Sequence, residues 1–530
     1  MTGGPAAGER RAGAASALRP DRLALAAAVT LLLALALYGY RVHWVEAAGT
    51  AERDGYVDQA RQLLSGSLPR DPYRPLLYPL LTAAVSRITG DPFAAARLLS
   101  NLAAAGLAWL AYAFGKRLSG VAAGGWAMAL AAVNPNLWII GQHVTTDMLF
   151  AALAAACLLA AARYLQAPGP GPAAAAGLAL GLAAFTRSNA LFLVPALLAA
   201  WWLAPSGGRR RLGHLALGTA AAALALLPHW ALRHAQFGKP FYDENWKNLA
   251  WKLYGYPDWS YLDRVPFRSL AAVVSHDPAA VLRAGVAEIW RFAAGGGAAQ
   301  LLGTWAHVLL VVAGTLWAVG DRRIRRSAAW LLFALGTFLM AIAFAFFTWG
   351  RLLLVLLPGA YALAFAPWGG AAPDGGPEPS RGRLGGRRRR LALHGIAAAA
   401  VLLLAVKTFA YRLPAFAASH PYVEVEMLRR LDRELPANAV LGGSSPFLGR
   451  YLRHRYVGLP DAFGPETVRP DLYYARLRPL LRNAGVAYLV VGPVDIRSRP
   501  PQLLGPRPPV AWLAAAGGDH GVVVWRVLMN

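Results

Sequence analysis

Three acidic residues lie close together just after the first long apolar segment of the chain. Glu52, Asp54 and Asp58 fall within seven residues, and Asp54 and Asp58 are four apart, so they share one face if this segment is helical. Carboxylates held beside low-dielectric material are suited to act as a general base or to bind a cation. The alternative is an amphipathic helix at a membrane interface whose polar face is acidic. The residues alone favour that alternative.

A further acid, Asp147, stands at the start of another apolar segment, four residues after His143. A His–Asp pair could hold a divalent cation, so these two residues are the candidate metal ligands of the sequence. The alternatives are that Asp147 caps the end of a helix and that His143 is a polar residue in a wet interface. In residues 411–530 no Cys/His spacing typical of a metal site appears.

Three arginines lie near the ends of apolar segments. Arg187 is the most suggestive, because a charge at that place is costly unless it serves a purpose. Arg74 and Arg351 have similar positions, although long arginine side chains near a membrane surface often only extend to the aqueous interface.

The composition indicates a membrane protein that positions these residues on helices. Of 530 residues, 57% are hydrophobic and 15% charged, and the mean hydropathy is +0.39. Many apolar runs approach the roughly 20 residues that a helix needs to cross a bilayer. The stretch Pro75–Ile88 is too short and is predicted to be re-entrant or interfacial. We predict a polytopic α-helical membrane protein with about eleven transmembrane helices, near Leu23–Tyr40, Ala94–Phe114, Val121–Ile140, Met148–Leu165, Ala173–Phe185, Ala190–Leu203, Leu215–Leu232, Leu301–Val319, Ala328–Phe347, Leu352–Trp368 and Leu391–Ala410.

The positions of the basic residues predict the orientation. The net charge of +26 is concentrated in short blocks such as Arg209–Arg211 and Arg387–Arg390, which alternate with loops that lack them. This pattern is the positive-inside rule, so the charge is a topology signal and nucleic-acid binding is not expected. The prediction is a cytoplasmic N-terminus, an uncleaved first span and an extracytoplasmic C-terminus. A composition rich in Ala, Gly and Arg is typical of GC-rich bacterial genomes and indicates the plasma (inner) membrane.

The same alternation places the segments 41–93, 233–300 and 411–530 outside. Residues 1–410 form the predicted membrane domain and residues 411–530 a small extracytoplasmic α/β domain. Within residues 411–530 we predict strands near Ala439–Leu441, Tyr456–Gly458, Ala487–Val491 and Val522–Val527, and helices near Val423–Glu434 and Leu472–Asn483. The single cysteine of the chain, Cys157, lies in the membrane domain and can make no intramolecular disulfide.

Several motifs, taken in order, resemble the start of the GT-C glycosyltransferases. They are Glu52-Arg-Asp54-Gly-Tyr56, an amphipathic segment ending in Leu63-Leu-Ser-Gly66, Arg74-Pro-Leu-Leu-Tyr78-Pro79, Ala96-Arg97-Leu, Thr146-Asp147, Leu182-Ala-Ala-Phe-Thr-Arg187-Ser and Pro228-His-Trp-Ala-Leu-Arg233. More narrowly, the chain resembles the bacterial relatives of the dolichyl-phosphate-mannose protein mannosyltransferases, which are glycosyltransferase family 39 and the aminoarabinose transferases. The likeness covers about the first 260 residues.

The resemblance implies a function and a set of site residues. It implies an inverting transfer of a sugar from a polyprenyl-phosphate donor to a glycan, lipid or protein acceptor on the outer face, with Asp54 as general base. Gly55 departs from the family pattern, because many relatives carry an acid there. The implied donor- or acceptor-binding residues are Glu52, Tyr56, Asp58, Arg74, Tyr78, Asp147, Arg187 and Arg351.

Two other classes of function stay open on the sequence. A transporter or flippase of a lipid-linked substrate would place ionisable residues in mid-span, whereas the acids here gather at the outer ends of the spans. A non-catalytic GT-C relative that binds sugar or lipid is kept open by Gly55.

Overall fold

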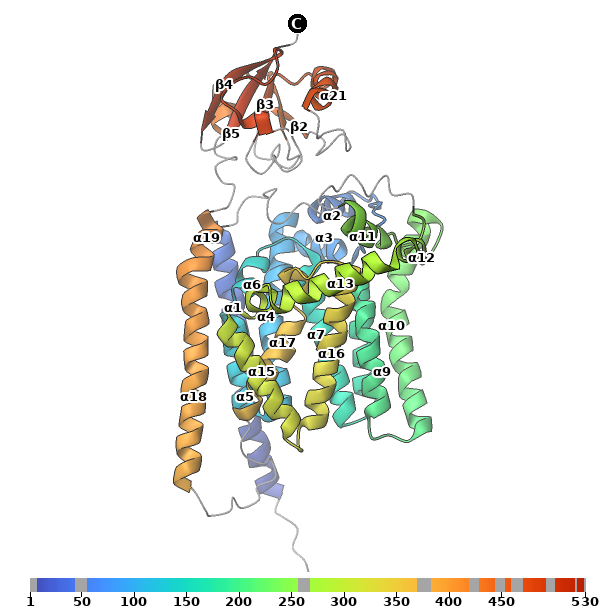
Figure 1. Ribbon diagram of the computed structural model, residues 1–530, viewed down its shortest axis with the longest axis vertical. Coiled ribbons are helices and arrows are strands. Elements are labelled where there is room, and N and C mark those ends of the chain that lie inside the picture. Colours follow the sequence, from blue (N-terminus) through green and yellow to red (C-terminus); the bar gives the residue numbers. More distant parts are fainter. Residues whose placement is uncertain are drawn as a thin grey trace, which may run out of the picture. The chain divides into compact units, whose positions relative to one another are not determined.

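The computed structural model describes residues 7–42, 55–255, 267–368, 383–418, 429–443, 453–458, 470–491, 501–519 and 522–528. By their contacts the residues divide into two units. The first comprises residues 1–39, 56–244 and 281–416, and the second comprises residues 40–55, 245–280 and 417–530. Figure 1 shows a helical first unit and a β-sheet in the second.

Long apolar helices dominate the first unit. Among the described residues, six helices are long and apolar enough to cross a membrane: Pro20–Arg41 within α1 (Ala7–Val42), α4 (Pro92–Ser119), α7 (Thr146–Gln166), α10 (Gly208–Phe237), α16 (Arg325–Ala345) and Arg388–Ala417, which comprises most of α18 (Arg383–Val406), a π-helical turn (Lys407–Arg412) and α19 (Leu413–Ala418). Four shorter apolar helices accompany them: α5 (Val121–Ala132), α8 (Pro170–Thr186), Ser188–Leu203 with α9 (Val194–Leu203), and α15 (Trp305–Gly320). The chain is therefore an integral membrane protein with multiple spans.

Two of the predicted spans are wrong as continuous helices. The predicted span Val121–Ile140 is divided into α5 and α6 (Pro135–Ile140), because Pro135 lacks the N–H that would continue α5 and Asn134 caps a new helix through a 2.8 Å hydrogen bond from Asn136 N. The predicted span Leu352–Trp368 consists of three pieces, the 3₁₀ turn Gly350–Leu353, α17 (Leu356–Ala364) and the 3₁₀ turn Ala366–Trp368. The number of spans therefore stays a prediction.

Short helices occupy the predicted outer loops. They are α2 (Tyr56–Leu64), α3 (Leu77–Thr89), α13 (Pro278–Ala293) and α14 (Gly297–Leu302). As expected for Pro75–Ile88, α3 has only 13 residues, too few to cross a bilayer. In Figure 1, α13 runs across the direction of the long helices, and its residues Leu282, Val286 and Trp290 are exposed.

Small residues allow the helices to pack closely. A methyl group on Gly177 of α8 would lie 1.9 Å from the carbonyl oxygen of Gly218 of α10, and one on Gly181 would lie 2.5 Å from that of Ala222. Membrane helices associate largely through such small-residue contacts, because lipid supplies no hydrophobic driving force between them. The buried core of this unit is accordingly rich in alanine and leucine.

The second unit contains a mixed five-stranded sheet in the order β2-β1-β3-β5-β4. The strands β1 (Val440–Gly443), β2 (Arg455–Gly458) and β3 (Tyr488–Val491) are parallel, and β4 (Leu513–Asp519) and β5 (Val522–Val527) are antiparallel to their neighbours. Helix α21 (Pro470–Asn483) packs Leu477 and Leu481 into the core with Trp525. The four predicted strands and the helix near Leu472–Asn483 are thus present, and β4 was not predicted. Only residues 429–434 of the predicted helix Val423–Glu434 are described, and they are helical.

The segment 245–280 of this unit is helical as well. It contains α11 (Trp246–Ala250), a π-helical turn (Trp251–Gly255) and α12 (Leu270–His276). Leu249, Ala250 and Val273 form a small buried cluster that is covered by Trp246, Tyr254 and Phe267.

Candidate functional site

A buried carboxylate begins helix α7. Thr145 is the N-cap residue, with its Oγ1 accepting from Asp147 N at 3.4 Å and donating to Asp147 Oδ2 at 2.9 Å. The Asp147 side chain is only 1% exposed. The N-terminal end of a helix stabilises a negative charge in its first turn. This position, however, is not enough to offset the burial of a carboxylate, which also needs cationic partners.

Two arginines from different elements supply that compensation. Arg187, the C-cap residue of α8, donates from its Nη1 to Asp147 Oδ1 at 2.5 Å and to Thr146 Oγ1 at 3.2 Å. Arg351, in the turn before α17, lies 3.8 Å from Asp147 Oδ2, and its guanidinium lies over the Trp349 ring at 5.3 Å. The side chains of Arg187 and Arg351 are 25% and 38% exposed. In this group, here called the arginine cluster, the two guanidinium groups are therefore more accessible than the carboxylate between them.

Helix α2 is joined to the same place. The hydroxyl of Tyr56, its first residue, lies 3.3 Å from Thr146 Oγ1, and the Tyr56 ring packs edge-to-face against Tyr78 at 5.5 Å. Tyr78 is fully buried and donates to the carbonyl oxygen of Ala96 at 2.8 Å. Tyr78 therefore packs against Tyr56 and links α3 to α4.

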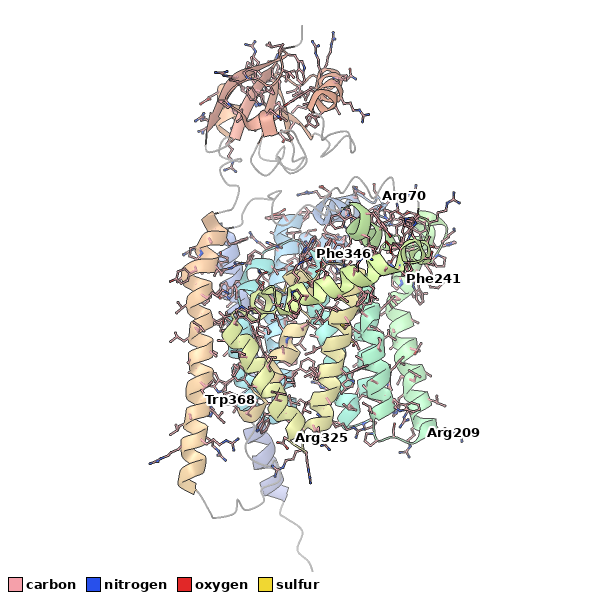
Figure 2. The ribbon with its side chains drawn as sticks, in the orientation of Figure 1. Arg70, Arg209, Phe241, Arg325, Phe346 and Trp368 are labelled. Atoms are coloured by element: carbon pink, nitrogen blue, oxygen red, sulfur yellow. The ribbon has the colours of Figure 1, made fainter. Side chains whose placement is uncertain are left out.

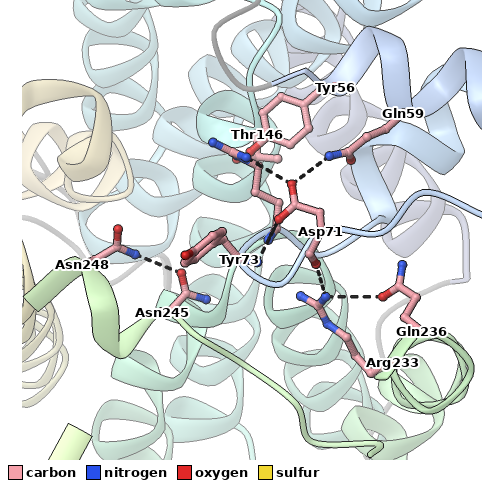
Figure 3. Close-up of polar contacts among 10 residues, drawn as sticks. Tyr56, Gln59, Asp71, Tyr73, Thr146, Arg233, Gln236, Asn245 and Asn248 are labelled. Carbon is pink, nitrogen blue, oxygen red and sulfur yellow. Dashed lines mark hydrogen bonds and ion pairs between the residues drawn. The ribbon is translucent and has the colours of Figure 1, made fainter. Parts of the chain in front are cut away.

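Asp71 is the centre of a second polar network, shown in Figure 3. Its Oδ1 accepts from the backbone N–H groups of Tyr73 and Arg74 at 2.8 and 2.9 Å. Its Oδ2 accepts from Gln59 Nε2 at 2.9 Å and from Arg74 Nη1 at 3.1 Å. Charge-assisted hydrogen bonds of this kind are strong, so Asp71 fixes the loop between α2 and α3.

Helix α10 holds the same loop from its other side. Arg233, 2% exposed, donates to the carbonyl oxygen of Asp71, and Gln236 donates to that of Pro69. The Arg233 guanidinium also lies 5.5 Å from the centre of the Phe237 ring. Side chains of α10 thus hold the loop after α2 by that loop's backbone carbonyl groups.

A third buried acid supports the turn that carries Arg351. Glu288 of α13 is 2% exposed and pairs with Arg291. Its Oε2 accepts from Thr348 N at 3.0 Å and from Thr348 Oγ1 at 2.8 Å. Because Thr348 stands three residues before Arg351, Glu288 helps to place that arginine beside Asp147.

The structure therefore brings together some of the predicted site residues and separates others. Tyr56, Asp147, Arg187 and Arg351 meet around the start of α7, whereas Arg74 pairs with Asp71. Asp58 forms an ion pair with Arg61 at 3.2 Å on α2. Asp54 and Glu52 lie outside the described residues.

The candidate metal ligands do not form a cluster in the part of the chain that the structure describes. There, no group of three or more His, Cys, Asp or Glu side chains is placed to hold a metal ion. The ring of His143 lies 6.0 Å from that of Phe416, and its backbone oxygen accepts from Ser100 Oγ.

Sequence reasoning missed Asp71, Arg233 and Glu288. Asp71 carried a usable signal, because an Asp-Pro pair commonly begins a turn in which the carboxylate accepts from backbone N–H groups two and three residues on. Arg233 lay within a recognised motif but was assigned no role. Glu288 could have been noticed as an isolated acid in an amphipathic helix.

Comparison with known proteins agrees with this fold. Residues 73–231 match the family of dolichyl-phosphate-mannose-protein mannosyltransferases. ArnT from Cupriavidus metallidurans, solved bound to undecaprenyl phosphate, has a TM-score of 0.59 and 16% sequence identity, over 94% of this chain and 97% of that chain. The oligosaccharyltransferase of Archaeoglobus fulgidus, solved with a tethered acceptor peptide, has a TM-score of 0.52 and 14% identity, over 87% of this chain and 68% of that chain. Among curated proteins no sequence matched.

The chain thus has the fold of the GT-C glycosyltransferases, a class of multi-span membrane proteins. Residues 73–231 match the model of the dolichyl-phosphate-mannose-protein mannosyltransferase family, and the fold is similar to that of ArnT. The predicted resemblance is confirmed.

Proposed function

We propose that this protein transfers a sugar from a polyprenyl-phosphate donor to an acceptor at the extracytoplasmic face of the plasma membrane. The family match supports a lipid-phosphate sugar as donor, since the name of that family specifies dolichyl-phosphate mannose. The likeness to ArnT supports a polyprenyl carrier, because that protein was solved with undecaprenyl phosphate bound.

The observation that carries this proposal is the arginine cluster at the start of α7. Two guanidinium groups lie beside one buried carboxylate, and both arginines are partly exposed while Asp147 is not. Fixed positive charge of this kind stabilises the negative charge that develops on a departing phosphate, and it needs no proton donor. Asp147 is then a positioning residue, which holds the arginines at a fixed separation.

The proposed reaction is a single displacement with inversion. The acceptor oxygen or nitrogen attacks the anomeric carbon as the bond from that carbon to the phosphate oxygen breaks. The acceptor proton passes to the carboxylate of Asp54, and the electron pair of the broken bond stays on the polyprenyl phosphate. Asp54 precedes Tyr56 by two residues, and the Tyr56 hydroxyl contacts Thr146, which neighbours Asp147.

The test uses purified full-length protein, a panel of polyprenyl-phosphate sugars carrying a radiolabel, and a membrane extract as acceptor. We expect wild type to transfer label and Asp54→Asn to lose about 100-fold or more in rate, the range typical of a general base. Asp321→Asn, which neutralises a carboxylate next to Arg322 and Arg323, is the matched control and should transfer like wild type.

Each other outcome has a distinct meaning. Transfer that survives in Asp54→Asn would reject Asp54 as the base but keep the enzyme class. No transfer, together with movement of a lipid-linked sugar across the bilayer of reconstituted vesicles, would reject the transferase in favour of a transporter.

A further inference from the structure

A cavity of about 900 Å³ lies among the arginine-bearing ends of three helices in the first unit. It is lined by the end of α9 and the starts of α10 and α16. Its wall is apolar, with Leu198, Leu215, Ala329 and Phe333 among the lining residues. Leu198 and Phe333 are 48% and 46% exposed, so the wall is open on one side.

The cavity is separate from the arginine cluster. Gln166, the last residue of α7, bonds to Ser327 beside this cavity, whereas Asp147 is in the first turn of the same helix. At 1.5 Å per residue, the 21 residues of α7 place the two sites about 30 Å apart. Figure 2 likewise shows Arg209 and Arg325 at one end of the helices and Arg70 and Phe346 at the other.

Positive charge stands at the rim of the cavity. Arg211 and Arg326 are among its lining residues, and no acid is present among the described residues that line it. Arg211 is held in place by donating to the carbonyl oxygens of Ala204 and Ser206 at 3.3 and 3.1 Å and by lying over the Trp202 ring at 5.5 Å. Arg326 is exposed. An anion at this rim would therefore meet two cations next to an apolar wall.

Two buried donors at the cavity have no acceptor among the described residues. They are the indole Nε1 of Trp201 and the Nε of Arg211, and Trp201 is only 8% exposed. Buried donors in native proteins almost always have a partner, because leaving one unsatisfied is costly. The Trp201 ring cannot move freely, since it packs against Gly218 and, edge-to-face, against Tyr164 at 6.1 Å.

We propose that this cavity binds an anionic glycerophospholipid of the bilayer. The acyl chains would fill the apolar wall, the phosphate would pair with Arg211 and Arg326, and phosphate or ester oxygens would accept from Trp201 Nε1 and Arg211 Nε. Basic residues beside a membrane attract anionic headgroups on the cytoplasmic leaflet, which is the leaflet predicted for this end of the helices. This site does not depend on the proposed transfer reaction.

The experiment measures lipid binding to delipidated full-length protein by native mass spectrometry. Phosphatidylglycerol and phosphatidylcholine with identical acyl chains are the two probes. We expect phosphatidylglycerol to bind at least about tenfold more tightly, and the double variant Arg211→Gln/Arg326→Gln to lose that difference. The matched control, Arg209→Gln/Arg210→Gln, removes the same charge from the same end of α10, outside the cavity, and should retain it.

A second variant tests the cavity without removing any charge, in case the arginine double variant does not fold. Ala329→Trp keeps every charge but fills the cavity, so it should weaken binding of both lipids while thermal unfolding stays like that of wild type. If both arginine double variants lost the preference for phosphatidylglycerol equally, that preference would come from general surface charge, and this result would overturn the proposal. So would binding in Ala329→Trp that equals wild type, or a preference of this cavity for undecaprenyl phosphate over phosphatidylglycerol.

Discussion

The ion pairs around Asp147 are the residue-scale feature with the largest expected effect. Arg187 makes the shorter contact, and Arg351 is 3.8 Å away, so Arg187→Gln leaves a buried carboxylate with one distant cation. We expect a loss of about 3 kcal/mol in stability, as for a broken buried pair, and a transfer rate about 100-fold lower. Thermal unfolding in detergent and the transfer assay measure the two effects.

The double variant Arg187→Gln/Asp147→Asn separates stability from chemistry. Removing both charges should recover much of the lost stability, because no uncompensated charge remains, but the transfer rate should stay low. Recovery of transfer in the double variant would mean that Arg187 serves only to neutralise Asp147.

A second residue-scale prediction concerns the pH dependence of the β-sheet unit. The hydrogen bond to Asp432 raises the pKa of His454, whose Nδ1 lies 2.6 Å from Asp432 Oδ1. The pKa of Asp432 is lowered, since burial, which would raise it, is outweighed by hydrogen bonds from His454 and Arg453. Stability from a raised histidine pKa is lost as pH rises through its folded value, and stability from a lowered aspartate pKa is lost as pH falls through its folded value.

The pair should therefore contribute most between about pH 4 and pH 6.5, the unfolded values of the two groups. Hydrogen exchange of peptides covering β1 and β2 measures this contribution, as the difference in protection between wild type and His454→Gln at each pH. The difference should be larger at pH 5.5 than at pH 8.5. A difference that does not change with pH would mean that only the neutral hydrogen bonds matter.

At the scale of elements, the pairing of α8 and α10 depends on glycine. Gly177→Ala places a methyl group against the backbone of Gly218, which cannot move as a side chain can, so the helices must separate. We expect a loss of about 1–3 kcal/mol, the usual cost of overpacking. Gly213→Ala is the matched control on α10, because nothing lies within 4 Å of a methyl group there and alanine is the better helix former.

Thermal unfolding of the two glycine variants provides the measurement. Equal midpoints for Gly177→Ala and Gly213→Ala would show that the α8–α10 contact does not limit the stability of the first unit.

At the scale of the whole molecule, the predicted orientation can be read by cysteine labelling. Cys157 is buried, so it provides a silent background. Ser67→Cys, in the segment predicted outside, should react with a membrane-impermeant maleimide in intact cells. Arg322→Cys, at the arginine-bearing end, should react only after permeabilisation, since the positive-inside rule places it in the cytoplasm. The reverse labelling pattern would overturn the orientation and move the arginine cluster to the cytoplasmic side.

The sequence alone determined the class of the molecule and most of its elements. Apolar runs identify membrane helices because the bilayer thickness sets their length, and four strands of the C-terminal sheet follow from β-branched and aromatic residues. Local signals were also present at the breaks, since Asn134-Pro135 predicts a helix end by the same rules that explain it. The apolar character of the whole run nevertheless favours one continuous span, because hydropathy averaged over a window does not register a single helix-breaking residue.

The strand β4 is an element that local sequence preferences do not predict. Its residues Leu513-Ala-Ala-Ala-Gly-Gly-Asp519 have little intrinsic preference for a strand, and they form one because β5 offers a ladder of hydrogen bonds and a bulge between Ala515 and Gly517 absorbs the irregular register.

Only the tertiary structure decided which charged residues meet. Asp147, Arg187 and Arg351 are recognisable one by one as charges near span ends, but they lie on three segments separated by 40 and 164 residues, and no periodicity links them. Asp71 and Glu288 escaped notice because a carboxylate in a loop or on an amphipathic helix looks like any exposed acid. Burial distinguishes them, and burial depends on which helices pack together, which is a property of the folded chain as a whole.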